Sequence, residues 1–348
     1  MGPEGGAGPT GPDVRVLQIH PTLRCNLRCL HCYSASGPDR TEELDVGLVR
    51  SVLTDARAEG YNAVGVSGGE PLLYGPLTAV LGHAKGLGMA TTVTTNGTVG
   101  TEAQLASLGG VVDLLAISLD GLGPAHNRMR GAPRAFESLV RRLPAVRATG
   151  IPFGFIVTLT LRNAAELGEL AEFAADQGAS LLQVHPLEET GSARDHLPGQ
   201  APDAEELTVA FLEAARIQRE YAGRLIVQFD AVDLEAARAE PGRLYADAPV
   251  ADPSARPLAD LVGSIVLEAD GVIVPLQYGF GRAYAIADAV TGLRAGAAAW
   301  KAATYPEFRA LCADAYGALV ERGSTARPFI NWYGAVSALS ASHRALSR

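Results

Sequence analysis

Three of the chain's four cysteines lie in one stretch of eight residues, Cys25-Asn26-Leu27-Arg28-Cys29-Leu30-His31-Cys32. Cys25, Cys29 and Cys32 are three, so a disulfide between two of them would leave one thiol unpaired and would close a very small, strained loop. A disulfide framework is therefore not expected. Thiolates this close repel one another unless a cation shares them, so the stretch predicts a metal centre, either an iron-sulfur cluster or zinc.

Composition narrows the class of protein. The chain has 348 residues, of which 47% are hydrophobic and 19% charged, and no apolar run approaches the roughly 18 residues of a membrane span. The formal net charge is -9 and no basic stripe is present, which argues against nucleic acid as a partner. Residues 1–13 are rich in Gly and Pro and lack the apolar core of a signal peptide, so we expect a flexible tail and a cytoplasmic, globular protein.

From Val14 to about Asp230, short β-rich runs alternate with amphipathic helical patterns, as in a parallel sheet built from β/α units. The predicted strands are Val14 to His20, Ala63 to Ser67, Ala90 to Thr95, Leu114 to Ser118, Phe153 to Thr160 and Ser180 to His185. The predicted helices are Val46 to Glu59, Leu77 to Leu87, Ala135 to Thr149 and Ala164 to Gln177, which end near Gly60, Gly88, Gly150 and Gly178.

Polar motifs follow the strands, where a barrel of parallel strands carries its chemistry. They are Ser67-Gly68-Gly69-Glu70-Pro71, Thr94-Thr95-Asn96-Gly97, Ser118-Leu119-Asp120-Gly121 and His126-Asn127-Arg128-Met129-Arg130-Gly131. Taken alone, Asn-Gly and Asp-Gly are also ordinary turn sequences, and the Gly-Gly-Glu segment fits a turn equally well. Binding and turn formation both remain open at this level.

The spacing C-x3-C-x2-C is similar to the signature of the radical S-adenosylmethionine (SAM) superfamily, and the motifs after the strands resemble those of the same family. The resemblance implies an α/β fold in which residues 14–235 form a partial (β/α)6 TIM-like barrel. It also implies that Cys25, Cys29 and Cys32 bind three irons of one [4Fe-4S] cluster, while the fourth iron takes SAM. The alternative from the residues alone is a structural zinc site completed by a histidine such as His31 or by Cys312.

The resemblance further implies the residues that contact SAM. Gly68, Gly69 and Glu70 would hold its amino group, and Arg130 its carboxylate, for which a planar guanidinium is suited. Asn96, Ser118 and Asp120 would line its methionine and ribose. His185 is interpreted as a core histidine at a strand end, and Glu188 and Glu189 as surface carboxylates.

The last third of the chain reads differently. A Pro-, Ala- and Asp-rich segment from Ala236 to about Pro257 resembles a linker, and Ser264 to Pro275 predicts a hairpin that turns at Asp270-Gly271. This hairpin is similar to the one that opens the SPASM or twitch extensions of many radical SAM enzymes. In those extensions a cysteine follows the proline, whereas here Leu276 and Gln277 follow. We therefore expect residues 236–348 to form a degenerate α+β extension without auxiliary clusters.

By resemblance, the chain is expected to be an enzyme that cleaves SAM reductively to a 5'-deoxyadenosyl radical and abstracts hydrogen from an unactivated substrate carbon. A ribosomally made peptide, epimerised or cross-linked, is the leading substrate. A small sugar or aminoglycoside-like metabolite is the alternative, and a zinc-stabilised binding module without catalysis is a more distant one. An external donor such as flavodoxin or ferredoxin would supply the electron. Cys312, the only cysteine outside the motif, is the candidate hydrogen donor, with a core position as the competing interpretation.

Overall fold

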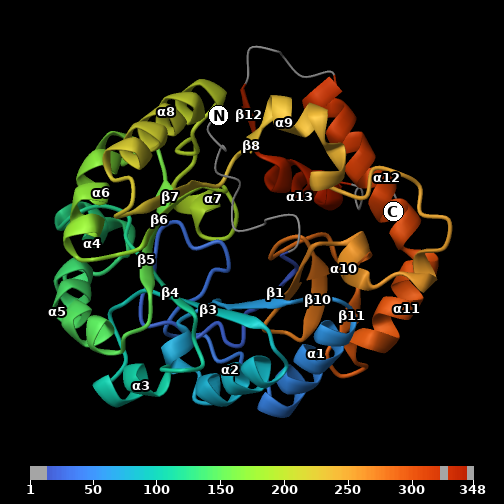
Figure 1. Cartoon of the computed structure of the whole chain (residues 1–348), viewed down its shortest axis with the longest axis horizontal. Coiled ribbons are helices and arrows are strands. Elements are labelled where there is room, and N and C mark those ends of the chain that lie inside the picture. The colour runs from blue at the N-terminus through green and yellow to red at the C-terminus, as the bar shows by residue number, and fades with distance from the viewer. Residues whose placement is uncertain (1–13, 322–327, 343–348) are drawn as a thin grey trace.

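A ten-stranded sheet organises the computed structural model of the chain, which describes residues 14–321 and 328–342. The tail predicted for residues 1–13 lies outside the described residues. The strands follow the order β11-β10-β9-β1-β2-β3-β4-β5-β6-β7. The sheet curves into an open ring with helices along its outer side (Figure 1). This arrangement is a partial TIM-like barrel, as the sequence predicted.

The first seven strands are parallel neighbours in chain order. They are β1 (Val16–Ile19), β2 (Ala63–Val66), β3 (Ala90–Thr95), β4 (Leu114–Ser118), β5 (Phe153–Leu159), β6 (Leu181–Pro186) and β7 (Ile226–Phe229). Six of them match the predicted strands closely. The seventh, β7, was not predicted. It is only four residues long, and the sequence between the sixth strand and the extension gave no further β/α repeat to mark it.

Helices connect these strands, and most of them cover the outer side of the ring (Figure 1). They are α1 (Val46–Ala58), α2 (Leu77–Gly86), α3 (Glu102–Ser107), α4 (Pro124–Met129), α5 (Ala135–Ala148), α6 (Leu167–Asp176), α7 (Ala193–His196) and α8 (Ala204–Glu220). The side chain of Asp45 caps α1 by accepting hydrogen bonds from the first-turn amides of Gly47 and Leu48. The four glycines predicted to end helices all have positive φ, between 69° and 95°, which a residue with a side chain adopts at a cost.

The two faces of the sheet differ in chemistry because side chains alternate along each strand. Residues facing the helices are apolar and fully buried, as are Leu17 and Ile19 in β1 and Val64 and Val66 in β2. The alternate positions face the interior of the ring, are only half-buried, and are largely polar. They include Gln18, Thr92, Thr94, Ser118, Thr158, Gln183 and His185. The hydrophobic core therefore lies between the sheet and the helices, and the interior of the ring is polar.

The predicted C-terminal hairpin is present and extends the same sheet past its first strand. It comprises β9 (Ser264–Leu267) and β10 (Val272–Pro275), with β9 parallel to β1 and β10 antiparallel to β9. The other elements of this part are β8 (Val232–Asp233), α9 (Leu234–Ala239), α10 (Leu258–Leu261), β11 (Ala287–Asp288), α11 (Leu293–Ala303), α12 (Tyr305–Tyr316), β12 (Phe329–Ile330) and α13 (Trp332–Ser342). A division of the chain near residue 236 stays a prediction.

The segment predicted as a linker is packed against the C-terminal helices. The ring of Tyr245 stacks on that of Trp332, with centroids 5.8 Å apart, and lies 5.7 Å from the ring of Tyr316. Arg309 donates a hydrogen bond of 3.1 Å to the carbonyl of Ala246. Within the described ranges, none of the helices has the length and apolar character needed to cross a membrane.

Candidate functional site

The three-cysteine stretch lies in the irregular segment between β1 and α1, which we call the cysteine loop (residues 20–44). Cys25 is buried, Cys29 and Cys32 are half-buried, and all three thiols are free. The backbone of Leu30 donates a hydrogen bond of 2.9 Å to the carbonyl of Met129, and that of Ser192 donates one of 2.8 Å to the carbonyl of Cys32. Loops after three different strands therefore hold the cysteine loop, including the loop after β2 described next.

Four glycines approach main-chain carbonyls of the cysteine loop more closely than a side chain would permit. The oxygen lies within 3 Å of where a Cβ on each glycine would stand. The approaches are Gly68 to the Thr22 oxygen (2.8 Å), Gly69 to the Arg24 oxygen (2.3 Å), Gly131 to the Arg28 oxygen (2.2 Å) and Gly191 to the Tyr33 oxygen (2.3 Å). We call these four residues the glycine clamp. The clamp explains why glycine stands at these four positions: there the cysteine loop and its neighbours pack backbone to backbone.

Glu70 is fully buried, and protein donors hold its carboxylate. Oε1 accepts hydrogen bonds from the hydroxyl of Thr95 at 2.8 Å and the amide of Leu72 at 3.1 Å, and Oε2 accepts one from the amide of Asn96 at 2.8 Å. A carboxylate has about four acceptor positions, so about one remains for another donor. Burial raises the pKa of Glu70 although these hydrogen bonds oppose it. The residue thus ties the loop after β2 to the loop after β3.

Asp120 and Arg130 form a buried ion pair at the end of β4. Oδ2 of Asp120 lies 2.7 Å from Nε of Arg130, in an approach that is not aligned as a hydrogen bond. Oδ1 accepts a hydrogen bond of 3.0 Å from the amide of Thr158. Burial alone would raise the pKa of Asp120, but the Arg130 charge, aided by His31 and His126, outweighs it and holds that pKa below its ordinary value. Asp120 is therefore a carboxylate that fixes Arg130.

His126 contacts the backbone of Asp120 and so helps to hold the ion pair in place, although the sequence interpretation assigned this histidine no role. Its Nδ1 accepts a hydrogen bond of 3.1 Å from the amide of Asp120. Burial lowers the pKa of His126 to about 4, so the ring is neutral at physiological pH. The motif that begins at His126 thus supplies two residues to one contact network, His126 and Arg130. The spacing His-x3-Arg was the signal available in the sequence.

Two of the predicted side chains reach the thiols. Nη1 of Arg130 lies 3.7 Å from Sγ of Cys29, and Nδ2 of Asn96 lies 3.8 Å from Sγ of Cys25. Asn96 also donates to Oδ1 of Asn26 at 2.9 Å. Ser118 is half-buried at the end of β4. The structure therefore brings predicted residues that follow three strands, β2, β3 and β4, together around the cysteine loop.

The electrostatics of the thiols test whether this loop suits a metal cluster. Burial, with smaller contributions from Glu70 and the other two thiols, raises the pKa of Cys25 to about 12. Burial also raises the pKa of Cys29, although Arg130 opposes the shift. Thiolates at these positions need a positive group among them, which bound iron supplies. Among the described residues, no group of three or more His, Cys, Asp and Glu side chains is arranged to hold one metal ion.

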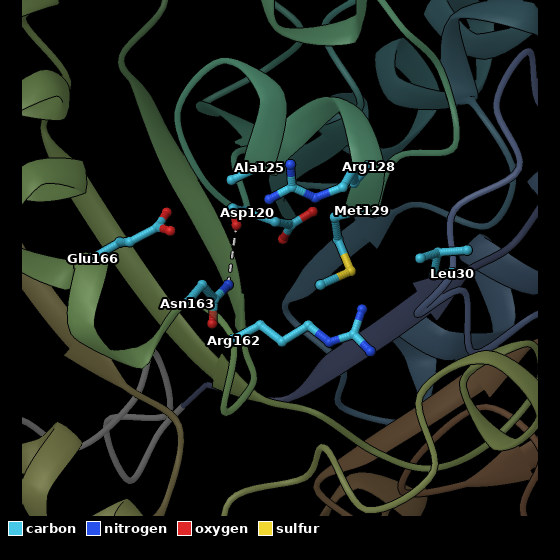
Figure 2. Close-up of a pocket in the computed structure, with 8 residues that line it drawn as sticks. All are labelled: Leu30, Asp120, Ala125, Arg128, Met129, Arg162, Asn163 and Glu166. Carbon is cyan, nitrogen blue, oxygen red and sulfur yellow. Dashed lines mark hydrogen bonds between the residues drawn. The ribbon is translucent and has the colours of Figure 1, made fainter.

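A small cavity of about 50 Å³ lies beside Asp120. It is lined by Leu30, Asp120, Ala125, Arg128, Met129, Arg162, Asn163 and Glu166 (Figure 2). Asn163 donates a hydrogen bond of 3.1 Å to the carbonyl of Asp120. Sites for ligands as large as SAM occupy about 300 Å³ or more, so this cavity is too small to be the SAM site.

An aromatic group not identified from the sequence joins the cysteine loop to the C-terminal hairpin. The ring of Tyr278, just after β10, stacks on His20 with centroids 4.8 Å apart and meets Tyr33 edge-on at 5.6 Å. Gln277 also donates to Glu188, across 3.4 Å. The two residues that follow Leu276 thus contact the end of β1 and the loop after β6, which places the extension at the edge of the site.

Cys312 lies on α12 and is 1% exposed. Burial raises the pKa of its thiol to about 12. The side chains that its charge influences include Tyr245, Tyr284 and Tyr305, all in the C-terminal part of the chain. The structure places it in the hydrophobic core, and a role as hydrogen donor stays a prediction.

Comparison with known proteins relates part of the chain to one family. Residues 19–174 match the model of the Radical SAM superfamily. The pre-heme d1 synthase of Dinoroseobacter shibae is 32% identical over 207 residues, which cover 58% of this chain and 51% of that protein. The PqqA peptide cyclase of Streptomyces rochei is 29% identical over 230 residues, which cover 65% of this chain and 62% of that protein. The chain spans about half the length of the first curated relatives it matches.

Two solved structures share the fold. SuiB of Streptococcus suis bound to SAM superposes with a TM-score of 0.66 at 16% identity and covers 86% of this chain and 68% of that one. Native anSMEcpe with bound SAM superposes with a TM-score of 0.62 at 16% identity and covers 94% and 96% of the two chains. At these identities the likeness shows the fold alone.

Proposed function

The chain carries a radical SAM domain in residues 19–174, and from this premise we propose that it is an enzyme that cleaves SAM reductively and abstracts hydrogen from an unactivated substrate carbon. Such domains use one [4Fe-4S] cluster and SAM. When bound, the cluster supplies the electron that breaks the sulfonium bond of SAM and yields the 5'-deoxyadenosyl radical. Cys25, Cys29 and Cys32 are the proposed cluster ligands.

The observation that carries this proposal is the glycine clamp around a loop of three free thiols. The clamp gives the loop one backbone path, so the three sulfurs are held in place before any metal binds. Asn96 and Arg130 approach two of those sulfurs from strand ends, which supplies hydrogen-bond donors next to the proposed cluster. Hydrogen bonds to cluster sulfurs are one of the ways in which a protein sets the reduction potential.

The same side chains are the proposed SAM contacts. The Asp120 carboxylate pairs with Nε of Arg130, and Sγ of Cys29 lies near Nη1. The remaining N–H groups of the guanidinium are therefore available to a ligand carboxylate. We assign that carboxylate to Arg130. Gly68, Gly69 and the last acceptor position of Glu70 are assigned to the amino group, and Asn96, Ser118 and Asp120 to the methionine and ribose. In each case the protein binds and orients SAM and excludes water from the radical.

A ribosomally made peptide is the proposed substrate, epimerised or cross-linked. Its support comes from relatives: a PqqA peptide cyclase among the curated proteins, and SuiB and anSMEcpe, each solved with a peptide bound. A small molecule is the second candidate. In the sequence interpretation this was a sugar or aminoglycoside-like metabolite, and several relatives named as heme-pathway synthases favour a small-molecule substrate in general. An external one-electron donor such as flavodoxin or ferredoxin is part of the proposal.

The test uses the full chain, reconstituted anaerobically with iron and sulfide and reduced with dithionite. We expect about four irons per chain and release of 5'-deoxyadenosine from SAM. A variant with Cys25, Cys29 and Cys32 all changed to Ala should lose both. Synthetic peptides and amino sugars are then compared for their stimulation of 5'-deoxyadenosine release. Zinc retained in place of iron, with no SAM cleavage, would support the binding-module alternative and refute an enzyme.

A further inference from the structure

Two neighbouring strands, β6 and β7, end in a carboxylate and an imidazole that hold each other. Nδ1 of His185 lies 3.2 Å from Oδ2 of Asp230. Asp230 also accepts hydrogen bonds from Nε2 of Gln183 at 2.5 Å and from Nε2 of Gln228 at 2.7 Å. The parallel register that pairs Gln183 with Gln228 brings all four side chains to one edge of the sheet. The two glutamine side chains thus hold the Asp230 carboxylate in place, and this carboxylate in turn orients the His185 imidazole.

This geometry determines where the imidazole carries its hydrogen. A carboxylate only accepts hydrogen bonds, so Nδ1 of His185 must be the donor to Asp230. In the neutral ring Nε2 is then left with its lone pair. A histidine held in this tautomer by a partly buried carboxylate has the form of a general base.

His185 is half-buried at the end of β6 and does not lie in the core that the sequence interpretation assigned to it. Its side chain is 45% accessible. The loop that follows β6 meets the cysteine loop, because the amide of Ser192 donates a hydrogen bond of 2.8 Å to the carbonyl of Cys32 and Gly191 packs against the carbonyl of Tyr33. Asp230 acts electrostatically on Tyr333, and Glu188 acts on both Tyr33 and His185, so these residues share one region. Tyr33 directly follows Cys32, which puts that region beside the cysteine loop.

We propose that His185 is a catalytic residue that takes a proton from an O–H or N–H group of the substrate, and that Asp230 is its positioning residue. This proposal rests on the proposed function. A bond forms between Nε2 and the proton, the substrate O–H or N–H bond breaks, and the electron pair of that bond stays on the substrate. The Asp230 carboxylate stabilises the resulting imidazolium. The substrate class is a compound with a hydroxyl, amide or amine group within hydrogen-bond reach of the imidazole when its reacting carbon faces SAM.

The charges around the imidazole suit this role. Asp230 faces it from the end of β7, Glu188 from the loop after β6, and His31 from the cysteine loop, while Tyr333 of α13 stands near Asp230. Burial lowers the pKa of His185, but the hydrogen bond and charge of Asp230, aided by Glu188, outweigh burial and raise that pKa above its ordinary value. The ring is therefore strengthened as a proton acceptor by its neighbours.

One arm of the test needs no substrate. Iron-loaded protein is treated with diethyl pyrocarbonate, which reacts with neutral imidazole, and modification of each histidine is followed against pH by mass spectrometry. We expect His185 to react with a single titration and the midpoint to move to lower pH in Asp230→Asn. His196, exposed on α7, is the internal control whose midpoint should not move. An unreactive His185, or the same midpoint in both proteins, overturns the dyad.

The other arm uses the compound that most stimulates 5'-deoxyadenosine release. His185→Gln should lower product formation at least about 100-fold, the usual contribution of a general base, while retaining the iron of the wild type. In Asp230→Asn the acid limb of the pH–rate profile should move to lower pH. Product formation within twofold of wild type in His185→Gln, or an unmoved limb, overturns the proposal. If the wild type itself releases no 5'-deoxyadenosine, the proposed function fails, and the diethyl pyrocarbonate arm still tests the dyad.

Discussion

Replacing Gly131 by Ala tests whether the glycine clamp is needed for metal binding. Two costs follow from the structure. Gly131 has φ of +64°, where an L residue costs about 1 to 2 kcal/mol. In addition, the new Cβ would lie 2.2 Å from the Arg28 oxygen, while Cβ contacts below 3.0 Å essentially never occur, so the backbones must separate by at least about 3.0 - 2.2 = 0.8 Å. The second cost falls on the cysteine loop between Cys25 and Cys29.

Gly150→Ala is the matched control because Gly150 has φ of +69° and open space around its Cβ position. Gly150→Ala should lose about 2 °C in unfolding temperature for a backbone cost near 1 kcal/mol, and Gly131→Ala should lose more because it also carries the second cost. Only Gly131→Ala should also lose iron on reconstitution, because a shift of this size exceeds what a preorganised metal site tolerates. Iron content, the visible absorption of the cluster and thermal unfolding are measured on the same samples. If Gly131→Ala binds as much iron as Gly150→Ala, close backbone packing is not what positions the cysteines.

Three further predictions concern single side chains. Asp120→Asn should lower the free energy of unfolding at neutral pH by about 3 to 5 kcal/mol in denaturant titrations, because it leaves the Arg130 charge buried without its partner. The pKa of Asp120 is lower in the folded protein than its unfolded value near 3.8, so the stabilisation is present above that value and is lost as pH falls through the folded pKa. The difference in stability between the two proteins should therefore shrink in acid. Glu70→Gln should weaken SAM binding about ten- to a hundredfold by calorimetry with iron retained, because the amide replaces an acceptor oxygen with a donor; unchanged affinity would refute the assignment of Glu70. Cys312→Ala should turn over in deuterated water with the same label in product as the wild type, because the thiol is core; a stalled variant would instead establish it as the hydrogen donor.

The sequence was sufficient for the strands and the loops that follow them because those signals are local. Alternating apolar residues and the glycines at helix ends need no knowledge of distant partners. The cysteine spacing is local as well. In contrast, β7 is recognised only by its pairing with β6, and a four-residue run carries too little pattern of its own.

The contact partners of the site residues could not be predicted from the sequence, because they lie far away along the chain. Gly68 and Gly69 were interpreted through a bound ligand, and the structure shows that they also approach carbonyls of the cysteine loop, more than forty residues away. His185 and Asp230 are separated by 45 residues. Nothing near His185 in the sequence distinguishes a core histidine from one held by a carboxylate on the next strand.

The C-terminal part reaches the site through the residues that follow its hairpin. Its hairpin adds β9 to β1 by parallel pairing, so the first strand has neighbours on both sides. The residue after Pro275, Leu276, has φ of +65°, a costly conformation for a residue with a side chain. That turn directs Gln277 to Glu188 and Tyr278 onto His20. Backbone strain of this kind persists only where the surrounding contacts outweigh it. The C-terminal part therefore contributes two side chains to the edge of the site.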